Sequence, residues 1–149
     1  METKKIKSIE NLLVVDDDKS LCYVIEHFFE DKKYNVTVIN NGSDAMSYLE
    51  KERPDLVFLD IGLPDISGLD VLKRIKEIDT AIKVIIITGY EADEKMVLLK
   101  SLNPDAFIHK PFSLEDLEKE LLKLQNGWID LIFKQLSDYW GLNHDRRME

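Results

Sequence analysis

The sequence predicts an α/β fold, a doubly wound five-stranded parallel sheet with helices on both faces, and two observations support it. Five short apolar or β-branched runs alternate with longer segments of helical periodicity, which is typical of repeated β-α-β units. The runs also lack polar alternation, so strands built from them would be buried on both faces of the sheet. The five expected strands are residues 12–15, 36–39, 56–59, 84–87 and 106–109.

The first and second helices are expected between the first three strands. One apolar stripe at helical spacing comprises Leu21, Val24, Ile25, Phe28 and Phe29. Asp18 precedes this stripe and is expected to cap the helix, because a short acceptor side chain satisfies free N–H groups of the first turn. The segment 43–51 is expected to form the second helix.

The other three helices are expected after the third, fourth and fifth strands. The third helix has its stripe at Leu69, Leu72, Ile75 and Ile78, and the fifth has its stripe at Leu114, Leu117, Leu121 and Leu124. The segment 91–101 is expected to form the fourth helix. Ser113, followed by Asp116 three residues later, predicts a cap and an acidic first turn for the fifth helix.

Composition restricts the class of protein. The chain has 149 residues with 20 Lys and Arg against 29 Asp and Glu, and its net charge of −9 disfavours direct binding of nucleic acid. The hydrophobic content of 44% indicates a soluble globular protein. The apolar runs are shorter than a membrane span and residues 1–11 lack a signal peptide's apolar stretch, so we expect no membrane insertion and a cytoplasmic location. The single cysteine, Cys22, excludes an internal disulfide and is expected in the core.

Polar residues follow four of the expected strands. Residues 16–18 are three aspartates after the first strand, Asp60 follows the third, Thr88 the fourth and Lys110 the fifth. Right-handed crossovers place the carboxyl ends of parallel strands at one edge, where open α/β sheets bind ligands. Two carboxylates repel by about 4 kcal/mol at about 4 Å when the effective dielectric is about 20, so the cluster should raise its pKa values or recruit a cation. Oxygen ligands of this kind suit Mg²⁺.

These groups are equipped for phosphoryl chemistry. A carboxylate beside a divalent metal can attack a phosphoryl group in line and form an aspartyl phosphate. Lys110 and the metal would neutralise the phosphoryl oxygens, and Thr88 would donate a hydrogen bond to one of them.

Four segments in this order resemble the receiver domains of two-component response regulators. They read LLVVDDD at 12–18, LVFLDIGLPDISG at 56–68, IIITGY at 85–90 and FIHKP at 107–111. The resemblance runs from about residue 11 to 125, so we expect a receiver domain at 1–125 and a different segment at 126–149. It implies a flavodoxin-like sheet of strand order 2-1-3-4-5.

The resemblance also implies roles for individual residues. Asp60 would be the phosphoacceptor, and Asp17, Asp60 and the backbone carbonyl of Gly62 would bind Mg²⁺ directly, with Asp16 reaching the metal through water. Thr88 and Phe107 would form a switch pair. The peptide bond between Lys110 and Pro111 would be cis.

The predicted function is a signalling switch that is not an enzyme acting on a separate substrate. It would take a phosphoryl group from a histidine kinase or phosphotransfer protein and change the face made by the fourth helix, fifth strand and fifth helix. That face would control a downstream protein or a linked output domain. A phosphatase of the haloacid-dehalogenase type is an alternative, but it would need a second acid where Gly62 stands. A flavin or nucleotide binder would need a Gly/Ser/Thr-rich loop in place of residues 16–18. A degenerate partner-binding receiver is disfavoured because every phosphorylation residue is present.

The segment after residue 125 has an apolar stripe of its own. Its members are Trp128, Ile129, Ile132, Phe133, Leu136, Tyr139 and Trp140. Such a stripe must be covered, by folding back, by a second copy of the chain or by a linker that leads to an output domain. We expect a homodimer held by residues 128–140 or by the face of the fourth helix, fifth strand and fifth helix, with Gly127 weakening a single unbroken helix and leaving a hinge.

Overall fold

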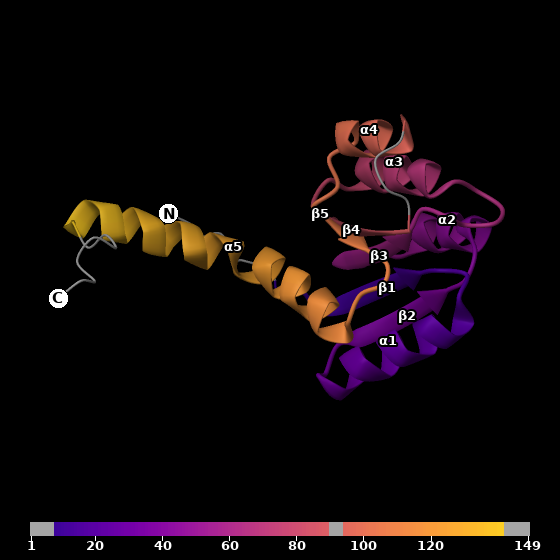
Figure 1. The fold of residues 1–149 in the computed structure, drawn as a ribbon, viewed down its shortest axis with the longest axis horizontal. Coiled ribbons are helices and arrows are strands. Elements are labelled where there is room, and N and C mark those ends of the chain that lie inside the picture. The colour runs from indigo at the N-terminus through magenta and orange to yellow at the C-terminus, as the bar shows by residue number, and fades with distance from the viewer. Residues whose placement is uncertain (1–7, 90–93, 142–149) are drawn as a thin grey trace.

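The computed structural model describes residues 8–89 and 94–141, and it confirms the predicted sheet (Figure 1). All strands are parallel and their order is β2-β1-β3-β4-β5. The strands are β1 (Asn11–Val15), β2 (Asn35–Ile39), β3 (Leu56–Asp60), β4 (Lys83–Thr88) and β5 (Ala106–His109). The helices are α1 (Lys19–Asp31), α2 (Gly42–Lys51), α3 (Gly68–Ile78), α4 (Glu94–Ser101) and α5 (Leu114–Trp140).

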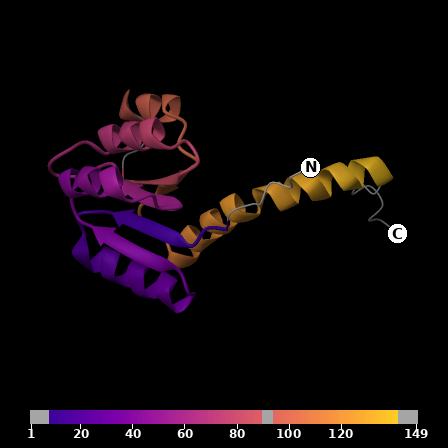
Figure 2. The same cartoon turned by 180° about the vertical axis from the view of Figure 1, so that it is seen from behind.

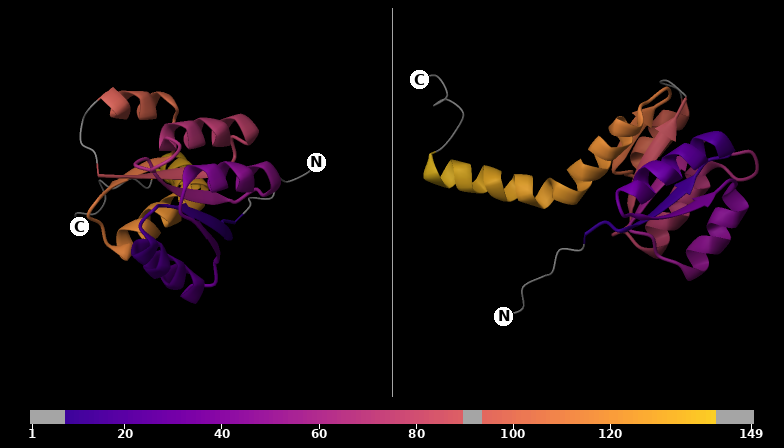
Figure 3. Two further views of the ribbon diagram at one scale, coloured as in Figure 1. Left: turned by 90° about the vertical axis from the view of Figure 1, so that its right-hand side faces the viewer. Right: turned by 90° about the horizontal axis from the view of Figure 1, so that it is seen from below.

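Successive residues of each central strand enter two different cores. Leu13, Val57 and Ile86 pack on the face covered by α2 and α3, whereas Phe58 and Ile85 pack on the face covered by α1 and α5. The view from behind and the end-on view show the sheet between these two helical layers (Figures 2 and 3). All five residues of β3 are buried, as the absence of polar alternation predicts.

Helix α1 is capped as predicted but buries a slightly different face. The Asp18 side chain accepts a hydrogen bond from the Leu21 N–H at 3.0 Å. The fully buried positions are Cys22, Ile25 and Phe29, which confirms the core position of the cysteine. Val24, expected in the stripe, is 45% exposed because the buried face of α1 is centred on Cys22, Ile25 and Phe29, and Val24 lies to one side of it.

Helix α5 is one continuous helix of 27 residues, so Gly127 weakens the helix without breaking it. Ser113 and Asp116 form the expected capping box at its start, and Gly141 ends it in the left-handed region at φ 68°. One glycine costs a helix about 1 kcal/mol relative to alanine, which the capped and packed helix tolerates. Figure 3 shows the helix bending between its two halves.

The second half of α5 projects away from the sheet (Figures 1 and 2). Ile132, Phe133, Leu136, Tyr139 and Trp140 are all exposed, so the fold-back alternative is wrong for these residues. The side chain of Trp128 lies outside the described part of the structure. Among the described residues, no helix combines the length and the apolarity that a membrane crossing requires.

Candidate functional site

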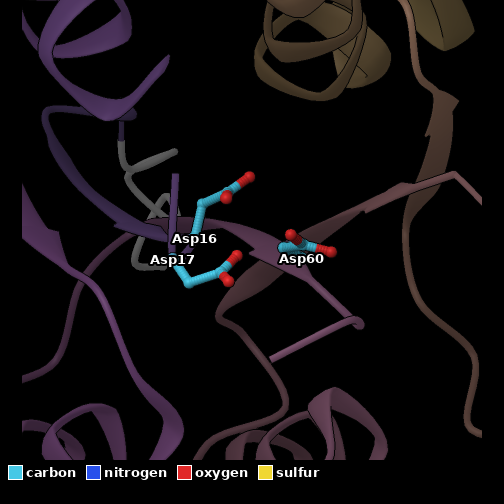
Figure 4. Close-up of side chains that lie close together, drawn as sticks. All are labelled: Asp16, Asp17 and Asp60. Carbon is cyan, nitrogen blue, oxygen red and sulfur yellow. The ribbon is translucent and has the colours of Figure 1, made fainter. Parts of the chain in front are cut away.

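Three carboxylates meet at the carboxyl-end edge of the sheet (Figure 4). Asp16 and Asp17 follow β1 and Asp60 ends β3, and these two strands are neighbours in the sheet. One carboxylate oxygen from each residue lies within 4.8 Å of the other two. Asp16 is fully buried, Asp60 is 6% exposed and Asp17 is open to solvent. The structure therefore brings together the acidic residues that the sequence placed at these strand ends.

Lys110 brings one positive charge to the cluster. Its Nζ lies 3.3 Å from Asp16 Oδ2 and 3.2 Å from Asp60 Oδ2. Its backbone N–H donates to the Thr88 carbonyl at 2.8 Å, and its peptide bond to Pro111 is cis, as expected. Burial lowers the pKa of Lys110, but the charges of Asp16 and Asp60 outweigh burial and the net shift is upward. The lysine is therefore held in its charged form.

Asp16 is strongly affected by its burial. Burial, opposed by the Asp18 N–H that donates to Asp16 Oδ1 at 2.9 Å, raises its pKa to about 6, and the charge of Asp60 adds to the rise. Asp16 Oδ2 is buried and accepts no hydrogen bond from any described residue, although the Lys110 ammonium lies nearby. A second cation beside Asp16 Oδ2 would offset the cost of burying this carboxylate oxygen.

The donor set fits a hard divalent cation. Three carboxylates and one ammonium leave a charge of about −2 when all are ionised, and the available ligand atoms are oxygens. Mg²⁺ is usually held by one or two carboxylates together with water and phosphate oxygens. The buried oxygen of Asp16 and the exposed carboxylate of Asp17 match this pattern.

The loop between β3 and α3 is fixed next to Asp60. The Gly62 N–H donates to Asp60 Oδ1 at 2.8 Å, so Gly62 lies beside the cluster. Gly68 begins α3 against this loop, and a Cβ there would lie 2.4 Å from the Ile61 Cα. This close contact gives Gly68 a packing role.

Asp65 anchors the same loop on α2, which the sequence did not predict. Its two carboxylate oxygens accept hydrogen bonds from the Gly42 N–H at 2.8 Å and the Ser43 N–H at 2.9 Å. These bonds lower the pKa of Asp65. A Cβ on Gly42 would lie 2.7 Å from the Ile66 Cβ, so loop and helix approach closely. The partners are 22 and 23 residues apart, and no local motif indicates them.

Thr88 and Phe107 lie on the neighbouring strands. Thr88 ends β4 and is fully buried, and Asp60 pairs with Ile87 of the same strand. Phe107 lies on β5 opposite Ile86 and is half-buried against the core that faces α2 and α3. The structure thus places Thr88 on β4 and Phe107 on β5, the two strands that α4 connects.

Comparison with known proteins identifies the family. The family model of the response regulator receiver domain matches residues 12–122. A probable transcriptional regulatory protein of Mycobacterium tuberculosis, TcrX, is 34% identical over 113 residues, covering 76% of this chain and 48% of TcrX. Sporulation initiation phosphotransferase F of Bacillus subtilis is 34% identical over 114 residues, covering 76% of this chain and 92% of that protein. The match thus covers about half of the transcriptional regulator and nearly all of the phosphotransferase.

A solved structure supports the same assignment. The receiver domain protein from Methanospirillum hungatei JF-1 superposes with a TM-score of 0.76 at 28% identity, covering 80% of this chain and 96% of that one. Fold, acidic edge and sequence matches agree over the same residues, and the chain belongs to the receiver domain family of two-component response regulators.

Proposed function

We propose that Asp60 is the phosphoacceptor of this receiver. The proposal rests on the position of Asp60 in the acidic cluster. Its Oδ1 accepts from Gly62 N–H while its Oδ2 contacts Lys110, and it keeps 6% exposure at the end of the central strand. Asp16 is fully buried, and Asp17 is not paired with Lys110 by any contact the structure describes. Asp60 thus combines access with a charged partner, as an attacking carboxylate requires.

Receiver domains generally bind Mg²⁺ at an acidic pocket, and the donors here support the same ion. Asp17, Asp60 and the carbonyl of Gly62 would hold it directly, and Asp16 would hold it through water. When bound, it would supply positive charge for the phosphoryl oxygens. Lys110 would orient a further oxygen, and the Thr88 hydroxyl would donate to another.

The phosphorylated state would act through Thr88 and Phe107. Thr88 would move toward the phosphoryl group, and Phe107 would turn into the space that this movement opens. The face of α4, β5 and α5 would repack as a result. The half-buried position of Phe107 on β5 and the hydrogen bond between Lys110 N–H and Thr88 O support this coupling.

Receiver domains are signalling proteins that work with histidine kinases and output domains rather than metabolic enzymes. For this chain we place the phosphoryl donor in a histidine kinase or phosphotransfer protein and the output in a downstream protein or linked domain. A cavity of about 420 Å³ lined by Leu21, Lys110, Pro111 and Phe112 offers apolar surface next to the acidic cluster, which supports docking of a donor there. A cytoplasmic location is part of the proposal, because response regulators typically act there.

The remaining parts of the proposal concern association and turnover. The net charge of −9 argues against direct binding of nucleic acid. A second copy of the chain would bind through the end of α5 or through the face of α4, β5 and α5.

The domain would catalyse its own phosphorylation and slow dephosphorylation and would not turn over another substrate. A haloacid-dehalogenase-type phosphatase is not favoured, since the residue two positions after Asp60 is Gly62, which has no side chain to act as a general acid.

Intact-mass measurement tests the acceptor. The wild-type chain, incubated with acetyl phosphate and Mg²⁺, should gain one phosphoryl group, and Asp60→Ala should gain none under the same conditions. Asp65→Asn is the matched control, because it removes a carboxylate from the adjoining loop and leaves the cluster intact. Uptake by Asp60→Ala to the wild-type extent would reject the assignment.

A further inference from the structure

Helix α5 carries two apolar faces. Leu117 and Leu121 are fully buried, and Leu114 and Leu124 pack beside them against the core shared with α1. From residue 125 to 140 the helix extends by about 24 Å, at about 1.5 Å per residue. Along this stretch five large apolar side chains are exposed, from 42% for Ile132 to 80% for Tyr139. The first face belongs to the receiver core, and the second has no partner within the described chain.

The outer face has the spacing of a coiled-coil seam. Ile129, Ile132, Leu136 and Tyr139 are separated by three, four and three residues, which gives alternating a and d positions of a heptad. Leu122, seven residues before Ile129, is also exposed, so the a positions continue onto the receiver. Phe133 and Trp140 widen the seam on one side. This spacing favours another helix as the partner over a flat surface.

The outer face is free of charge. The charged residues between 122 and 140 are Lys123, Asp130, Lys134 and Asp138, and all of them fall at heptad positions b, c or f. Lys123 is paired with Glu120 at 3.1 Å, away from the seam. Charged partners would meet no complementary group here, whereas an identical helix would meet apolar residues at every a and d layer except that of Gln125.

We propose that a second copy of the chain covers this face, with the two α5 helices paired in parallel over residues 122–140. Parallel pairing sets each a and d residue against its own counterpart and covers Leu122 in both copies. Antiparallel pairing of residues 129–139 would match the outer layers but leave Leu122 in water. Gln125 occupies the d position between Leu122 and Ile129, and its Oε1 accepts the Ile9 N–H of its own chain.

This pairing deepens the self-association included in the proposed function, and it assigns that association to α5. Helix α5 is continuous from its cap at Ser113 to its end at Gly141. The residues that pack on the receiver core and those that form the seam therefore belong to one continuous helix. A dimer of this kind places the two receivers side by side at the same end of the paired helices.

Sedimentation equilibrium of the full chain tests the pairing. Wild type should form a dimer, and Leu136→Lys should raise its dissociation constant on the order of 100-fold, because an unpaired ammonium would enter the seam. Lys134→Glu reverses a charge at an outer position only two residues away and should leave the constant within about twofold. Both variants should still take up a phosphoryl group in the intact-mass assay, which separates this proposal from the assignment of Asp60.

Cysteine crosslinking tests the direction. Leu122→Cys and Leu136→Cys should each form a disulfide between two copies, because both are a positions of a parallel pair. Lys134→Cys should not, and the native Cys22 is buried with its pKa raised by burial to about 12. A monomeric wild type, a dimer that Leu136→Lys leaves unchanged, or failure of Leu122→Cys to crosslink would each overturn the proposal.

Discussion

The acidic edge and the projecting half of α5 are built in opposite ways. The edge joins residues far apart in sequence, since Lys110 contacts Asp60 and Asp16, 50 and 94 positions earlier. The projection consists of one helix, and its apolar residues are neighbours at helical spacing. The acidic edge lies at the carboxyl ends of the strands. Helix α5 runs back from the end of β5 toward the amino ends, where it contacts the Ile9 N–H that precedes β1, so the two regions lie at opposite ends of the strands.

This difference separates chemistry from association. Asp60 and Thr88 end strands in which every residue except Lys83 is buried, so their geometry depends on the whole receiver. The large apolar side chains described between Ile132 and Trp140 are exposed, so changes there should alter association and leave stability and phosphorylation unchanged. Matched mutations in the two regions test whether phosphorylation and association are independent.

The largest contrast is expected between two leucines of α5. Leu121→Ala should lower the free energy of unfolding by about 3 kcal/mol, because it opens a cavity in the core shared with α1. Leu136→Ala, the same substitution on the projection, should change it by less than about 0.5 kcal/mol in a monomeric sample. Urea denaturation at low protein concentration measures both. Similar losses would mean that the projection packs on the receiver.

At the acidic edge, two adjacent aspartates should behave differently. Asp17→Ala should weaken Mg²⁺ binding on the order of 100-fold without loss of stability, since it removes a ligand and relieves repulsion. Asp18→Ala should lower stability by about 1 kcal/mol through loss of the α1 cap and leave Mg²⁺ binding nearly unchanged. Titration calorimetry and thermal unfolding separate the two. Unchanged Mg²⁺ affinity in Asp17→Ala would remove this residue from the site.

These contrasts also show what the sequence could predict. The strands and the polar residues at their ends were predictable, because hydrophobic runs define buried strands and parallel strands bring their carboxyl ends together. The strand order came only from the family resemblance. In α5, the capping box and both apolar stripes follow from helical periodicity.

The differences between expectation and structure have local and non-local causes. Gly127 is a weak helix former, but a single unfavourable residue cannot end a helix that is capped at both ends and packed over its first turns. Val24 was expected inside because Cys22 was not counted as part of the stripe. The Asp65 contacts to Gly42 and Ser43 join a loop to the first turn of α2 through tertiary structure, so the periodicity of the sequence does not predict them.

A phosphoryl mimic should divide α5 into a responsive and an unresponsive part. Beryllofluoride with Mg²⁺ should shift the amide NMR signals of residues 94–125, because Thr88, Lys110 and Phe107 link Asp60 to α4, β5 and α5. In the Leu136→Lys chain, which is expected to be monomeric, signals of residues 132–140 should shift less. If residues 94–125 did not respond, the switch involving Thr88 and Phe107 would be wrong.

The smallest effect is expected at Asp65, which supports the acidic edge without belonging to it. Hydrogen bonds from Gly42 and Ser43 lower the folded-state pKa of Asp65 below its ordinary value of 3.8, so the carboxylate stabilises the fold above that pH. This contribution is lost as pH falls through the folded-state pKa. Asp65→Ala should therefore lower the melting temperature slightly at pH 7, and its difference from wild type should shrink in acid.

Asp65→Asn supplies the control, because its amide oxygen can still accept one of the two hydrogen bonds but does not ionise in this range. Its melting temperature at pH 7 should lie between those of wild type and Asp65→Ala. Since the loop also carries Gly62, both variants should weaken Mg²⁺ binding, but less than Asp17→Ala does. A difference between wild type and Asp65→Ala that stayed constant down to the acid limit would show that the loop is held by packing, with Gly42 against Ile66, and not by the charge of Asp65.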